Sequence, residues 1–89
     1  MPSFYDSLEP EQAEEIESLS QLTYELRENR AAVLQSHGVA DEAALLARIR
    51  AGKVDEHPAY EHYLAVCILA DTREAVRTLI AQRLKEYNS

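Results

Sequence analysis

The sequence predicts an all-α protein, an antiparallel hairpin of two long helices with a short connecting helix, for three reasons. The chain of 89 residues contains only two glycines and three prolines, so few positions interrupt a helix. It lacks the alternating runs of β-branched residues that are typical of strands. Its glycines and prolines divide it into three helical segments, which we expect to form a single domain over residues 1–89.

The first predicted helix begins near Ser7 and ends near His37. Ser7 precedes an acidic turn and Pro10, and a cap hydroxyl, negative charge and an early proline are typical of a helix N-terminus. Residues 1–6 precede this start, and we expect them to form a disordered tail. Gly38 suits the left-handed conformation that commonly ends a helix.

A short second helix is predicted over residues 42–51. Asp41 precedes this segment and has the side chain of a good N-cap residue. Gly52 follows it and can end the helix as Gly38 ends the first one. Residues 53–57 are then predicted to be a loop.

The third predicted helix runs from Pro58 to Tyr87, because proline is tolerated in a first helical turn. Its apolar face changes near Asp71, and two explanations are open. Asp71 could cap a new helix, with Glu74 completing a capping box, so that the chain bends there. Alternatively the helix is continuous, and one half packs on the first helix while the other packs on a partner subunit. The absence of glycine and proline after Pro58 favours the continuous helix.

The two long helices are expected to dimerise into a helical bundle. Each would be about 40 Å long at 1.5 Å per residue, whereas a compact domain of this size has a radius of gyration of about 12 Å. A hairpin of this length leaves one flank uncovered, and a second copy covers that flank in bundles built from two hairpins. The predicted interface consists of apolar residues at helical spacing: Leu19, Leu22, Leu26, Val33, Val76, Leu79, Ile80 and Leu84.

The net charge of −7 arises in the first 26 residues, which carry seven acids and no base, whereas the remaining residues carry nine of each. Acids near a helix N-terminus are stabilised by the helix dipole and face water. The alternative interpretation is a mimic of nucleic acid or a docking surface for a basic partner, with Glu11, Glu14 and Glu15 as the candidate docking residues. Nucleic acid is disfavoured as a partner, because no cluster of Lys and Arg stands out.

Residues 56–63 collect the most polar functional groups, so a metal site is considered there first. On a helix His57 and Glu61 share one face, but His62 points about 100° away from Glu61. At most two ligands then converge, whereas zinc takes three or four, and the segment matches neither HExxH nor a di-iron ExxH motif. We therefore predict no metal and no cofactor, and a structural role for these side chains at the start of the helix.

Two further polar side chains lie within apolar surroundings. Arg30 projects into the apolar sector of the first helix, where a buried guanidinium needs a carboxylate. The predicted partner is Asp71, with Glu74 as the other candidate, and the Arg30–Asp71 pair either fixes the helix register or forms the floor of a small polar pocket. Cys67 lies within an apolar run, where a thiol is inert, so no catalytic residue is predicted.

These observations predict a small acidic cytoplasmic protein that acts as a non-enzymatic protein–protein interaction or regulatory module and whose partner is itself. The start of the chain lacks a signal-peptide pattern, one cysteine cannot form an internal disulfide, and no apolar run approaches the length of a membrane span. Two isolated glycines form neither GxGxxG nor a P-loop. Residues 57–64 resemble a motif of small bacterial proteins, and this resemblance implies no activity.

The alternative function is a small transcriptional or antitoxin-like regulator that binds a basic partner or DNA. The predicted turn and short helix have the approximate lengths of a helix-turn-helix. However, the short helix carries Arg48 and Arg50 at its C-terminal end, whereas recognition helices usually contact bases near their N-terminus. A metal-dependent enzyme is the third hypothesis, and it has the least support in the sequence.

Overall fold

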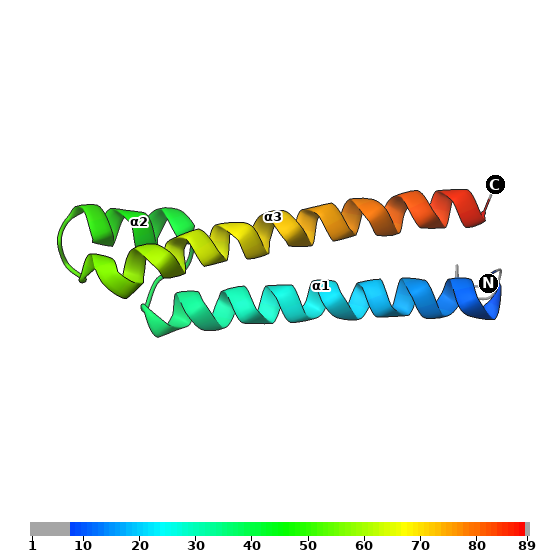
Figure 1. Ribbon diagram of the computed structural model, residues 1–89, viewed down its shortest axis with the longest axis horizontal. Helices are drawn as coiled ribbons and strands as arrows, with labels where there is room; N and C mark the ends of the chain where they lie inside the picture. The colour runs from blue at the N-terminus through cyan, green and yellow to red at the C-terminus, as the bar shows by residue number, and fades with distance from the viewer. Residues whose placement is uncertain (1–7, 89) are drawn as a thin grey trace.

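The computed structural model describes residues 8–88 and shows a long helical hairpin with a short helix at its closed end (Figure 1). Helix α1 spans Pro10–Ser36, α2 spans Glu42–Arg50 and α3 spans Glu56–Tyr87. The molecule measures 53 × 21 × 18 Å, and its radius of gyration of 17.5 Å is well above the value of about 12 Å for a compact domain of this length. The predicted all-α hairpin is confirmed.

Helix α1 begins at Pro10, three residues after the predicted cap. Glu9 is the N-cap residue, and its backbone N–H donates a hydrogen bond of 3.0 Å to the side-chain oxygen of Gln12 in a capping box. Proline at the first helical position is favourable, because its missing N–H would have no partner there. Ser7 and the predicted tail over residues 1–6 lie outside the described residues.

The turns around α2 follow the sequence signals closely. Gly38 follows α1 with φ 67° and Gly52 follows α2 with φ 70°, so both glycines adopt the left-handed conformation. The carboxylate of Asp41 accepts a hydrogen bond of 2.8 Å from the backbone N–H of Ala44, as expected of an N-cap. The helix ends at Arg50, one residue before its predicted end.

Helix α3 is continuous past Asp71, so the predicted continuous helix is confirmed over its described length. Within its bounds, the non-helical backbone is at His57, with φ −107° and ψ 126°, directly before Pro58. A residue that precedes proline is pushed towards extended conformations, which explains this position. Asp71 caps no new helix and is exposed to solvent.

The core lies at the closed end, where α2 covers the hairpin. Leu34, Leu45 and Val66, one from each helix, form a buried cluster. Leu45 and Val66 have no exposed surface. Towards the open end α1 and α3 run side by side (Figure 1), and among residues 8–88 no third helix covers them there and the buried apolar side chains are Ile16 and Val76. Two paired helices bury one stripe each, so this part of the chain has a thin core.

Candidate functional site

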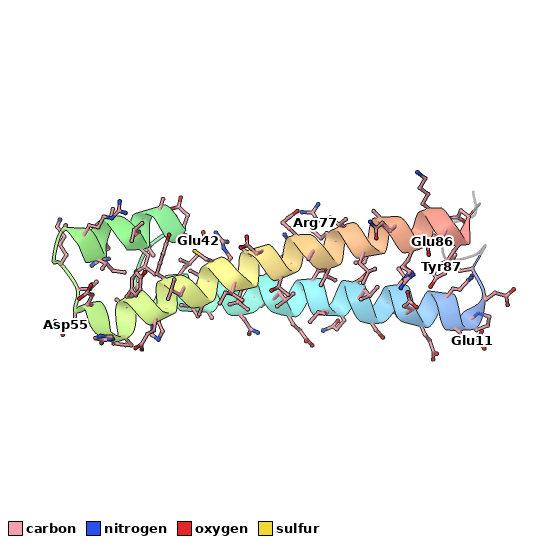
Figure 2. The ribbon with its side chains drawn as sticks, turned by 45° about the horizontal axis from the view of Figure 1, so that its top comes forward. Glu11, Glu42, Asp55, Arg77, Glu86 and Tyr87 are labelled. Carbon is pink, nitrogen blue, oxygen red and sulfur yellow. The ribbon has the colours of Figure 1, made fainter. Side chains whose placement is uncertain are left out.

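A polar cluster at the junction of the three helices centres on Arg30. Its Nε and Nη2 atoms each donate a hydrogen bond of 2.6 Å to the carboxylate of Glu42, the first residue of α2. Figure 2 shows Glu42 at the end of α2 that points towards the middle of the hairpin. The predicted Arg30–Asp71 pair is therefore wrong. Because α2 folds back over the hairpin, its first turn reaches Arg30, and the exposed Asp71 does not.

This ion pair shifts both pKa values in the direction that favours the charged forms. The hydrogen bonds from Arg30 lower the pKa of Glu42, against the opposing effect of partial burial. The hydrogen bonds to Glu42 likewise raise the pKa of Arg30. The two side chains are only 30% and 21% exposed, and the two-pronged geometry is that of strong guanidinium–carboxylate pairs. The pair thus fastens α2 to α1.

A cavity of about 300 Å³ lies beside this ion pair, between α1, α3 and the start of α2. Besides Arg30 and Glu42, the charged side chains that line it are Arg27, Arg73 and Glu74. A small polar pocket at Arg30 was one of the two predicted alternatives, but with Asp71 as its other member. No pattern in the sequence points to Arg73, because its position in the cavity follows from the packing of α3 on α1.

Four of the five charged residues that line the cavity have partners within the chain. Glu42 binds Arg30, Arg27 contacts Glu28 at 3.2 Å, and Glu74 contacts Arg77 at 3.2 Å. Arg73 differs from them. Its side chain is half-buried, its Nε atom is shielded from solvent, and no hydrogen bond or ion pair joins it to any residue from 8 to 88.

Two histidines join α1 to α3 near the closed end. Nε2 of His37 lies 2.8 Å from Nδ1 of His62, and the rings meet edge to face with centroids 5.1 Å apart. Arg48 of α2 donates a hydrogen bond of 2.7 Å to the backbone carbonyl of His37. His57 is exposed, and its Nδ1 atom lies 3.0 Å from Oε1 of Glu61, so these two side chains meet although the backbone at His57 is not helical.

The His37–His62 contact was not predicted, although the register of the hairpin implies it. In an antiparallel hairpin each step towards the turn on α1 matches one step back along α3. Once Leu34 is placed opposite Val66, the same register brings His37 opposite the turn of α3 that contains His62. Over residues 8–88, no group of three or more His, Cys, Asp or Glu side chains is arranged to hold a metal ion.

The acids proposed for docking differ in their surroundings. Oε1 of Glu15 lies 3.1 Å from Nε of Arg83, which ties the open end of α1 to α3. Burial and a hydrogen bond with Glu15 raise the pKa of Tyr87 nearby. Glu11 and Glu14 are exposed, and Figure 2 shows Glu11 pointing away from α3. Glu15 therefore has a structural contact, while the other two acids face solvent.

The predicted dimer interface lies largely between the two long helices of one chain. Val76 is only 9% exposed, whereas Leu22 is 38% exposed. The half-buried members are Leu19, Leu26, Val33, Leu79, Ile80 and Leu84. Helical spacing identified the apolar faces of the two helices, but it could not say whether the same chain or a second chain covers them. Leu22 is the most exposed of the eight predicted interface residues.

A different apolar surface is exposed on the first half of α3. Tyr60, Leu64 and Ile68 are 42%, 44% and 64% exposed. Their spacing of four residues places them on one ridge of the helix, on the side away from the buried Val66. We call these three residues the α3 ridge. Leu64 and Ile68 belong to the apolar run around Cys67, residues 64–70, and α1 and α2 cover only the inner side of this part of α3.

The part of the sequence that forms the helical hairpin matches the model of a known protein family. The model of that family matches residues 10–87, from the first residue of α1 to the last residue of α3. The chain belongs to the uncharacterized protein MJ0235 family. The MJ0235 match includes the Arg30–Glu42 pair, the cavity and the α3 ridge. Comparisons with curated proteins and with solved structures gave no match. Over residues 8–88, none of the helices combines the length and apolar character needed to cross a membrane.

Proposed function

We propose that this member of the MJ0235 family is a non-enzymatic interaction module that forms a homodimer through the α3 ridge and acts in the cytoplasm. The α3 ridge is the observation that carries the proposal. Soluble proteins expose single apolar side chains routinely, but a row of neighbouring ones is typical of an interaction surface. Ile68 is the most exposed of them, at 64%, and it stands in the middle of an apolar helical turn.

The small core of one chain supports the need for a partner. Across residues 8–88, the buried apolar side chains are Ile16, Leu34, Leu45, Ala59, Val66 and Val76. A chain of 89 residues has a small stability margin even when it is compact, and this one is extended to 53 Å. Covering the ridge with a second chain would add buried apolar area without changing the hairpin.

The position of the acidic residues favours an antiparallel arrangement of the two copies along the α3 ridge. In a two-fold symmetric contact centred on Leu64, Ile68 of one chain packs against Tyr60 of the other. Among the described residues, the acids Glu9, Glu11, Glu14, Glu15 and Glu17 lie at the open end of the hairpin, about 30–40 Å along the helix from the level of Leu64. In this arrangement the two open ends point in opposite directions. The acidic segments are then separated by several Debye lengths, so their repulsion is screened.

The variant Ile68→Glu tests this proposal, because Ile68 is exposed and its replacement leaves the hairpin core intact. Sedimentation velocity should show the wild type at twice the 10.1 kDa of one chain. The variant should dimerise at least ~100-fold more weakly, because a charge would be buried in the interface. Thr78→Glu, an exposed position on the same helix outside the ridge, is the matched control and should remain dimeric.

Two outcomes would contradict the proposed interface. One is a wild-type protein that stays monomeric and folded at millimolar concentration. The other is a dimer that Ile68→Glu leaves unchanged. Leu22→Glu tests the interface expected from the sequence, since Leu22 is exposed on α1. If that variant alone dissociates the dimer, the contact involves the flank between α1 and α3 instead of the ridge.

The exposed acids of α1 support a second candidate function, docking of a basic protein in an antitoxin-like regulator. Glu11 and Glu14 face solvent, and no contact within residues 8–88 engages either carboxylate. Capture of a basic partner by the wild type, lost when both residues are changed to Gln, would support this role. Binding that persists in the double variant would contradict it.

A further inference from the structure

The cavity at the three-helix junction has the character of a ligand site that is separate from the α3 ridge. We propose that it binds a small carboxylate with a short apolar body, and that Arg73 receives the carboxylate. This inference goes beyond the proposed function and does not depend on dimerisation. It rests on the state of Arg73, the charge of the cavity walls and the chemistry of the cavity floor.

Arg73 is a half-buried cation without a partner. The other half-buried arginines between residues 8 and 88 each have one: Arg30 binds Glu42, Arg48 binds the carbonyl of His37, and Arg83 contacts Glu15. The Nε atom of Arg73 is shielded from solvent and has no acceptor. A shielded donor without an acceptor is unfavourable, and an unpaired guanidinium is free to take a counterion. A ligand carboxylate would supply both.

The walls favour an anion over a cation. Three arginines and two glutamates line the cavity, and among these five residues only Arg73 has no oppositely charged partner within residues 8–88. Glu42 is held by Arg30, and Glu74 contacts Arg77 on the solvent side of α3. A guanidinium presents its donors in a fork that matches the two oxygens of a carboxylate. Local charge therefore selects an anion although the chain carries a net charge of −7.

The remaining lining is apolar and the space is small. Leu26, Leu69 and Ala70 complete the cavity, which has a volume of about 300 Å³. This volume is at the lower end of the range for small-molecule sites, so a ligand with only a few carbon atoms beyond its carboxylate fits. The apolar lining would then contact the hydrocarbon part, while Arg73 holds the charged end.

Titration with sodium hexanoate, followed by the backbone amide signals in nuclear magnetic resonance spectra, tests this inference. We expect saturable shifts centred on Leu69 and Ala70. Arg73→Gln should weaken binding at least ~10-fold, the loss expected when one charge-assisted contact is removed. Lys85→Gln removes one positive charge from the same helix outside the cavity and should leave the affinity unchanged. Glu74→Gln should strengthen binding, because it removes a negative charge from the cavity wall.

Two further ligands separate the contributions of charge and apolar contact. Acetate carries the carboxylate without the apolar body, and hexanol carries the apolar body without the charge, so both should bind more weakly than hexanoate. The inference is overturned if hexanol or acetate binds as tightly as hexanoate, if Arg73→Gln binds like the wild type, or if hexanoate gives no saturable shifts. The same titration on the Ile68→Glu variant should give the wild-type affinity, so failure of the ridge proposal and failure of this one are distinguishable.

Discussion

Arg30 and Glu42, twelve positions apart in the chain, are joined by two hydrogen bonds of 2.6 Å that cross from the C-terminal third of α1 to the first turn of α2. The contact decides how the short helix lies on the hairpin. It holds the N-terminal end of α2 towards the open part of the molecule, while Leu45 anchors the middle of α2 in the core. Because Glu42 also lines the cavity, the same contact shapes the wall next to Arg73.

Replacing Glu42 by Gln should lower the free energy of unfolding by about 1–2 kcal/mol at neutral pH. The reason is that Arg30, only 30% exposed, would lose its counterion and keep at most a neutral acceptor. Urea denaturation followed by far-ultraviolet circular dichroism measures this change. Glu28→Gln is the control, because the Arg27–Glu28 pair is exposed to solvent and should contribute at most about 0.5 kcal/mol. Equal losses in the two variants would show that the Arg30–Glu42 contact has no special weight.

The stabilisation by Glu42 should depend on pH in a defined direction. Its folded-state pKa is lowered by the hydrogen bonds from Arg30, so the stabilising effect is fully present above the ordinary glutamate value of 4.5 and is lost as the pH falls through the folded-state pKa. The difference in unfolding free energy between wild type and Glu42→Gln should thus be constant above that value and shrink below it. Other carboxylates titrate in both proteins and cancel in the comparison. If the difference in unfolding free energy stayed constant until Glu42 is fully protonated, the ion pair between Glu42 and Arg30 would not be its source.

The two aspartates that precede α2 and α3 should differ in their contribution to stability. Asp41 accepts a hydrogen bond of 2.8 Å from Ala44, whereas Asp55, at the corresponding position before α3, makes no such bond. Asp41→Ala should therefore cost about 1 kcal/mol, and Asp55→Ala at most about 0.5 kcal/mol. Thermal or urea denaturation distinguishes the two values. If Asp55→Ala were the more damaging change, the capping of α2 would not be the source of the effect.

Local signals in the sequence determined the elements of this fold. Gly38 and Gly52 predicted the ends of two helices, and Asp41 predicted the start of the second. These predictions succeeded because a left-handed turn and an N-cap each depend on one or two neighbouring residues. The start of α1 was less well predicted, because Glu9, which is not among the usual N-cap residues, forms a capping box with Gln12.

Tertiary structure alone decided which side chains meet. Helical periodicity placed Arg30 on the inner face of α1, but its partner depended on the path of the chain after Gly38, which brings Glu42 rather than Asp71 within reach. The isolation of Arg73 and the exposure of Ile68 likewise depend on which helix covers which face. A residue's position around its own helix is fixed by the 3.6-residue repeat, whereas its neighbours are fixed by the direction in which the next helix packs, and the repeat carries no information about that direction.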